Sequence, residues 1–171
     1  FLGHTGILAV ATGIGYGTAA AALLLWNGVE NAAWSAFAGM VGTSVLLGAA
    51  FVSLGGLASV VVRDRATAAG IAVGIWLLFV LLYDTALLGM LVADQGETIG
   101  ARQLDMLLLL NPTDAYRLLN LTGSESVSVY AGMAGPGEAG RLSPTLLVAA
   151  LVAWIAAPLG LATAILSRRQ L

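Results

Sequence analysis

The clearest candidate for chemistry in this chain is one carboxylate inside an apolar stretch. Asp84 interrupts a run of more than twenty apolar residues between positions 66 and 94. An ionisable side chain at lipid depth costs at least about 2.5 kcal/mol and normally faces a bundle interior, a wet cavity or a partner. Asp84 is therefore a candidate for a pathway or gate through a membrane. A structural role, such as a hydrogen bond to a neighbouring hydroxyl, is the equal alternative.

A second group of polar residues lies in the sequence LLLLNPTDAYRLLNL, at positions 107–121. Pro112 cannot continue a helix, and the residue before a proline is biased away from the helical conformation. Thr113 can cap a second helix, whose first turn then holds Asp114 where the helix dipole favours an anion. Asp114 and Arg117 are three residues apart, so they can pair on one helix face.

Other reactive groups are scarce. The chain has no Cys, which excludes disulfides, thiolate nucleophiles and Cys metal sites. Its only histidine, His4, is expected at an interface rather than as a ligand. Four methionines could supply thioether ligands for Cu(I), but their spacing is not that of a ligand set and packing explains them better. An intramembrane enzyme needs a nucleophile with a base, or a metal site, and we predict neither.

The composition places these residues in a membrane protein. Hydrophobic residues make up 59% of the chain and charged residues 9%, against about 25% charged in soluble domains. There is no Lys, and the net charge is -2. The chain therefore has no basic field for nucleic acid, and the lipid bilayer is its expected partner.

Hydropathy predicts four transmembrane helices, at about residues 5–26, 35–62, 67–93 and 144–166, in a single all-α domain. Cytoplasmic loops are enriched in Lys and Arg, so the turn Arg63-Asp64-Arg65 and the pair Arg168-Arg169 are expected inside. The loop around Glu30 and residues 94–143 are then expected outside.

The outer segment, residues 94–143, is too long to be a simple connector. It divides into a helical part at 99–121 and a polar, Gly-rich part at 122–141. We predict a hairpin of two short helices, broken at Asn111-Pro112, that dips into or lies on the outer leaflet. A surface amphipathic helix fits the pattern equally well.

Three stretches carry a resemblance to a known family. The runs AAGIAVGIWLLFVLLYD and LLLLNPTDAYRLLNLTG, together with the opening FLGHTGILAVATGIGYGTAAAALLL, resemble the ABC-2-type permeases that serve nitrous oxide reductase maturation. By this resemblance the four predicted spans correspond to the last four of six. The first two spans of the family, and the main cytoplasmic coupling helix after them, are then missing from this chain.

The resemblance implies a permease homodimer in the bacterial inner membrane, with cytoplasmic ATPase subunits and a periplasmic β-helical accessory protein. ATP hydrolysis would drive a conformational change that exports a sulfur species or assists copper delivery to the reductase. A chain without Lys cannot contain the phosphate-binding G-x-x-x-x-G-K-[ST] motif, so ATP and Mg are expected in the ATPase subunit and no cofactor in this chain. A permease of another ABC-2 exporter and a non-catalytic membrane scaffold are the alternatives.

The resemblance also suggests contacts with the partners. The predicted hairpin lies on the side where the periplasmic protein docks, and its candidate contact residues are Asn111, Pro112, Asp114 and Arg117. The inner turn supplies candidates that face the ATPase, namely Arg63, Asp64 and Arg65. The topology alone already explains why this turn is basic.

Overall fold

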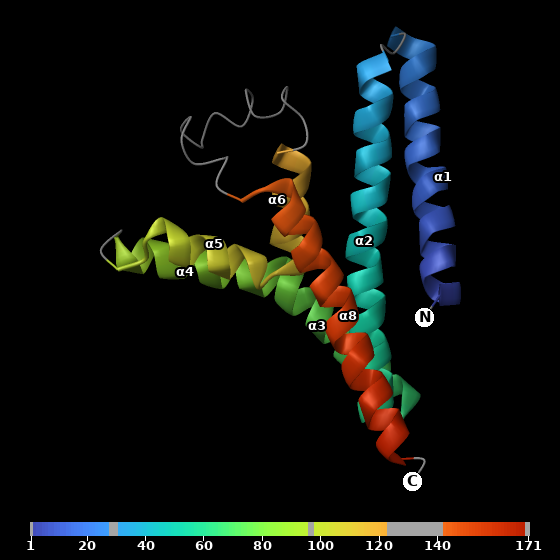
Figure 1. Cartoon of the computed structure of the whole chain (residues 1–171). Coiled ribbons are helices and arrows are strands. Elements are labelled where there is room, and N and C mark those ends of the chain that lie inside the picture. Colours follow the sequence, from blue (N-terminus) through green and yellow to red (C-terminus); the bar gives the residue numbers. More distant parts are fainter. Residues whose placement is uncertain (1, 28–30, 96–97, 123–141, 170–171) are drawn as a thin grey trace.

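The computed structural model describes residues 2–27, 31–95, 98–122 and 142–169 (Figure 1). Within these ranges the chain is helical apart from short turns, and no strand occurs. The prediction of an all-α fold is therefore confirmed for the described part. The predicted Gly-rich segment and the loop around Glu30 lie outside the described residues.

Three helical stretches are long and apolar enough to cross a membrane, and they span Ala38–Val61, Arg65–Asp94 and Pro144–Arg168. These three candidate spans coincide with the predicted spans at 35–62, 67–93 and 144–166. Helix α1 (Leu2–Asn27) forms where the first span is predicted, but it is not among the stretches that qualify within the described residues. The first predicted span, at residues 5–26, therefore stays a prediction.

Helix α2 (Asn31–Val61) is the centre of the bundle, and α1, α3 (Arg65–Leu77) and α8 (Pro144–Arg169) pack against it (Figure 1). Small residues allow these close approaches. A Cβ atom at Gly48 would lie only 2.0 Å from Leu8 of α1. The buried Ser53 hydroxyl also donates a hydrogen bond to the Trp154 carbonyl of α8 at 3.2 Å. Small residues at the interface and hydrogen bonds between helices are the usual means by which membrane helices associate.

The third span bends at a π-helical turn. Leu78–Leu82 form this turn, η1, between α3 and α4 (Tyr83–Asp94), and the Tyr83 N–H bonds to the Leu78 carbonyl five residues earlier. In Figure 1 α4 then leads away from the direction of α2 and α8. Single π-helical turns are frequent at functional sites, and this one ends two residues before Asp84.

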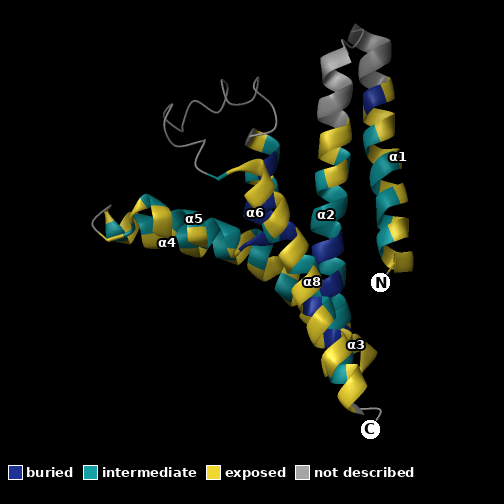
Figure 2. Cartoon of the chain, in the orientation of Figure 1, coloured by how far each residue is buried: buried dark blue, intermediate teal, exposed yellow. Residues whose placement is uncertain are grey.

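The predicted hairpin is present as α5 (Ala101–Leu109) and α6 (Pro112–Thr122), with the break at Leu110 and Asn111. Helix α6 packs between α2 and α8, and Figure 2 shows buried segments on these helices. The core of this contact consists of Ala115, Leu119, Leu147 and Leu151. The packing of α6 against two spans fixes the position of its polar residues.

Candidate functional site

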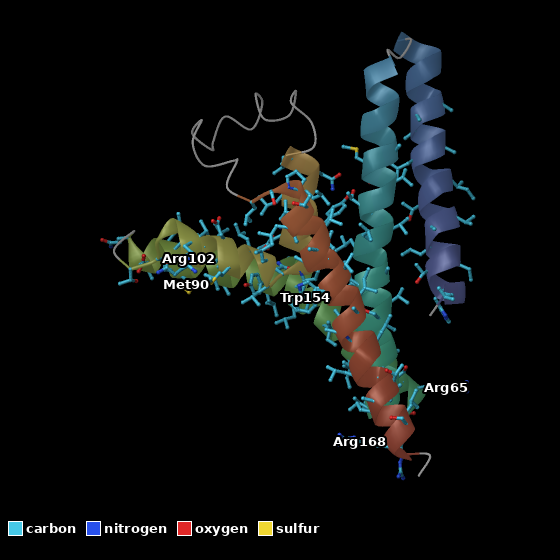
Figure 3. All side chains as sticks on the ribbon, viewed as in Figure 1. Arg65, Met90, Arg102, Trp154 and Arg168 are labelled. Carbon is cyan, nitrogen blue, oxygen red and sulfur yellow. The ribbon has the colours of Figure 1, made fainter. Side chains whose placement is uncertain are left out.

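The tip of the hairpin lies deep along α8. The Trp154 indole N–H donates to the Leu109 carbonyl at 3.2 Å, and Trp154 follows Pro144 by ten residues, or about 15 Å of helix. The same indole packs edge-on against Phe79 of η1, with ring centroids 5.1 Å apart. A tip at this level favours a hairpin that dips into the membrane over a helix on its surface. Figure 3 shows Trp154 where α8 passes the hairpin.

Two aromatic side chains bind the last turn of α5. The Tyr83 hydroxyl donates to the Leu107 carbonyl at 2.7 Å, and Trp154 bonds to the Leu109 carbonyl. The final carbonyls of a helix lack partners within the helix, so these side chains supply what a surface helix would take from water. Sequence reasoning missed both residues. The available signal was an aromatic ring with a polar atom placed inside a predicted span.

Asn111, not Thr113, caps the second helix. The Asn111 side-chain oxygen accepts the Thr113 N–H at 3.0 Å, and the Asn111 carbonyl accepts the Ala115 N–H at 3.0 Å. The predicted cap was wrong because Pro112 itself occupies the first helical position, where its missing N–H costs nothing. Thr113 is then the second helical residue, and its buried hydroxyl has no hydrogen-bond partner in the described part of the chain. Asp114 lies in the first turn, as predicted.

The amide nitrogen of Asn111 joins the hairpin to the third span. It donates to the Phe79 carbonyl of η1 at 3.0 Å and to Asp114 at 2.9 Å, and it lies 3.5 Å from the Asp84 carboxylate. Asn111 is fully buried. An Asn side chain carries two donors and one acceptor oxygen, and here both ends of the amide are used. Asn111 therefore links α6, η1 and α4.

Asp84 forms an ion pair with Arg117 of α6, which also pairs with Asp114 at 3.3 Å. The predicted pairing of Asp114 with Arg117 is confirmed. The bond between Asp84 and Arg117 was not predicted, because 33 residues separate them and no local pattern relates the two. The exposed fraction is 44% for the Arg117 side chain and 29% for Asp84. We call Asp84, Asn111, Asp114 and Arg117 the polar cluster.

The polar cluster contains two carboxylates and one guanidinium. A charge buried alone in an apolar setting is very costly, whereas a paired and hydrogen-bonded charge is tolerated. Arg117 compensates one carboxylate, and the Asn111 amide donates to the Asp114 carboxylate. These bonds hold the hairpin of α5 and α6 against the third span. The described residues contain no group of three or more His, Cys, Asp or Glu side chains that could hold a metal ion.

Of the other predicted residues, Pro112 lies within the polar cluster, and Arg63, Asp64 and Arg65 lie apart from it. Pro112 is fully buried, like its neighbour Asn111. Arg63 and Asp64 are exposed in the turn between α2 and α3, and Arg65, which is also exposed, begins α3. Figure 3 shows Arg65 and Arg168 at the same end of the molecule, which agrees with the prediction that both lie on one side of the membrane.

Replacing Asn111 with Ala is expected to destabilise the hairpin by about 2–3 kcal/mol. About 1 kcal/mol comes from the helix cap, and the rest from the hydrogen bonds to Phe79 and Asp114. Asn111→Ser, which keeps a capping oxygen but loses the amide donor, is expected to recover part of this. The measurement is the thermal unfolding midpoint of the full-length protein in detergent.

The matched control is Gln103→Ala, which removes an exposed amide from α5 and should change stability by less than about 0.5 kcal/mol. Equal midpoints for the Asn111→Ala and Gln103→Ala variants would show that Asn111 does not hold the hairpin to the span.

Comparison with known proteins shows the family of this chain. The whole chain, residues 1–171, matches the family described as ABC-2 family transporter protein. A probable ABC transporter permease protein NosY from Pseudomonas aeruginosa is 44% identical over 173 residues, which cover 100% of this chain and 62% of the relative. A protein of the same description from Stutzerimonas stutzeri is 43% identical over 171 residues, 99% of this chain and 62% of the relative. The chain thus spans about 62% of the length of these two relatives.

Proposed function

The chain belongs to the ABC-2 family of transporter proteins, and on this premise we propose that it is part of a permease that supports copper-site assembly of nitrous oxide reductase. The similarity to two probable NosY permeases along the whole chain is the observation that carries the proposal. The residues around Asp84 and the NPTDAYRLLNL sequence carry the resemblance to that maturation system. The proposed location is the bacterial inner membrane.

The ATP chemistry is proposed to lie in cytoplasmic ATPase subunits, which would bind ATP and Mg. This chain would receive the motion that hydrolysis produces. Its candidate contact is the exposed turn Arg63-Asp64-Arg65, whose last residue begins α3. A displacement of this turn would pass along α3 to η1, because a helix transmits movement along its axis as a stiff element.

The polar cluster is the proposed point where that motion reaches the outer side. Two bonds join the middle of the third span to the hairpin, one from Asn111 to the Phe79 carbonyl and one from Arg117 to Asp84. The hairpin would therefore move with the span. In this account Asp84 acts as a gate residue by its attachment to the hairpin.

The outer partner is proposed to be a periplasmic β-helical accessory protein. Arg117 is the most exposed member of the polar cluster, with 44% of its side chain accessible. Asn111, Pro112 and Asp114 are buried, so their proposed part in this contact is to position Arg117. The exported species would be a sulfur compound, or the cycle would assist copper delivery. We further propose a permease homodimer.

The proposal predicts that the intact protein is recovered with an ATPase. Affinity purification of the full-length permease from its native membrane in mild detergent should yield a nucleotide-binding subunit in a fixed ratio. A variant lacking the acidic loop at Glu30, on the predicted outer side, serves as the control and should retain that subunit.

Two outcomes would redirect this account. Recovery of the intact protein with no nucleotide-binding subunit would support the membrane scaffold. Recovery with an ATPase but without any effect on nitrous oxide reductase would support a permease of another ABC-2 exporter.

A further inference from the structure

A cavity of about 510 Å³ opens beside the turn between α2 and α3, away from the polar cluster. It lies at the end of the molecule that carries Arg65 and Arg168 (Figure 3). Apolar walls and a basic rim line it. The wall residues used below are Gly55, Ala69 and Ala72, and the rim residues are His4, Arg63 and Arg65. We call this cavity the inner pocket.

The walls of the inner pocket form a slot between two helices. At its upper end α2 and α3 are in contact, since a Cβ atom at Gly55 would lie 3.7 Å from the Ala72 Cβ. From there to Val62 the slot extends seven residues along α2, or about 10 Å. Side chains no larger than a methyl group at positions 55, 69 and 72 keep it open. The slot suits a hydrocarbon chain.

The rim of the inner pocket carries uncompensated positive charge. Arg63 and Arg65 are exposed, and the described part of the chain contains no ion pair for either. The Asp64 carboxylate is already engaged, because it accepts the Thr67 N–H and the Thr67 hydroxyl, each at 2.7 Å. These bonds lower the pKa of Asp64, so it stays ionised as the cap of α3. Two guanidinium groups against one carboxylate leave a net charge of about +1 at the rim, and the His4 imidazole offers a further hydrogen bond.

We infer that the inner pocket binds one anionic phospholipid of the inner leaflet. Its phosphate group lies between Arg63 and Arg65, and the upper part of an acyl chain fills the slot. Basic pockets between transmembrane helices on the cytoplasmic side are a recurring way to hold anionic lipid head groups. A free phosphate ion would use the rim but leave the slot empty. An ATPase surface would meet the tip of the turn but would not reach about 10 Å up between two spanning helices.

The test uses the full-length permease with its partner subunits, reconstituted in phosphatidylcholine nanodiscs that contain a minor fraction of phosphatidylglycerol. Native mass spectrometry then counts the lipids that stay bound. The wild-type protein should retain phosphatidylglycerol above its share of the nanodisc. Each Arg near a lipid surface is expected to contribute about a fivefold preference, so the double variant Arg63→Gln/Arg65→Gln should lose nearly all enrichment.

Two further variants separate charge from shape. Arg168→Gln removes the same charge at the same end of the molecule but outside the inner pocket, and it should keep the enrichment. Ala69→Leu keeps every charge while filling the slot, and it should lose bound phosphatidylglycerol without losing the ATPase subunits. The Ala69→Leu result also stands if the double Arg variant fails to assemble.

Three results would overturn the inference. The first is a wild-type protein that shows no enrichment of phosphatidylglycerol. The second is displacement of the lipid by excess inorganic phosphate, which would make the rim a site for the free ion. The third is a double Arg variant that keeps the lipid but loses the ATPase subunits, which would assign the turn to docking of the ATPase.

Discussion

Reversing the charge of Arg117 is expected to reduce the amount of assembled permease in the membrane several-fold. In Arg117→Asp the carboxylates of Asp84 and Asp114 lose their guanidinium and face a third negative charge. Removing one partner of a buried pair costs about 3–5 kcal/mol. Because Arg117 is 44% exposed, screening should reduce this to about 1–3 kcal/mol. Changes of that size alter cellular abundance several-fold.

Exchanging the two charges should reverse the loss of membrane abundance. In Asp84→Arg/Arg117→Asp a guanidinium on α4 again faces the carboxylates on α6, so the cluster keeps its count of charges. Membrane abundance should return to at least half of the wild-type value, whereas recovery with the outer partner should stay reduced, because position 117 then carries a carboxylate at the proposed contact. Quantitative immunoblotting of membranes and affinity recovery measure these two quantities.

Arg102→Asp is the matched control for this exchange. Arg102 is exposed on the neighbouring helix α5 and lies outside the polar cluster, so its reversal should leave abundance near the wild-type level. If the double variant is as depleted as Arg117→Asp, the pair of Asp84 and Arg117 does not hold the hairpin.

The spans and the hairpin break could be predicted because they depend on local signals. Long apolar runs predict membrane helices from the cost of exposing backbone and charge to lipid. Pro112 predicts a break from its missing N–H and its ring. Both signals act over a few residues, so they can be recognised in the chain before it folds. The ends of the three candidate spans also follow from the turns that flank them.

The links between elements could not be predicted in the same way. At the hairpin tip, aromatic side chains from three helices form hydrogen bonds or pack together, namely Phe79, Tyr83 and Trp154. The hydropathy of the sequence does not predict which of these residues contact one another. The π-helical turn at Leu78–Leu82 has a sequence, LFVLL, that suits an ordinary α-helix equally well. The cap was placed at Thr113 rather than Asn111 because two good capping residues flank Pro112 and only the start of the helix decides between them.

The proposed link to nitrous oxide reductase has a direct consequence in the cell. We expect a strain that lacks this gene to produce the reductase without its normal copper content. The permease would be needed for a step outside the cytoplasm that no soluble ATPase can perform alone. The loss of copper from the reductase should be nearly complete, because no soluble protein can replace a subunit that spans the membrane.

Complementation makes this expectation specific to the polar cluster. The wild-type gene should restore the copper content, Arg117→Asp should restore little of it, and Asp84→Arg/Arg117→Asp should restore an intermediate amount, because it assembles but carries a carboxylate at the proposed outer contact. Reductase protein levels, measured in the same cells, separate a failure of copper loading from a failure of synthesis.

The most direct measurement is the copper content per reductase molecule, determined by elemental analysis of the enzyme purified from the deletion strain and from the complemented strain. The account predicts a reductase nearly free of copper in the first strain and fully loaded in the second. A normally loaded reductase in the strain without the gene would contradict the proposed function.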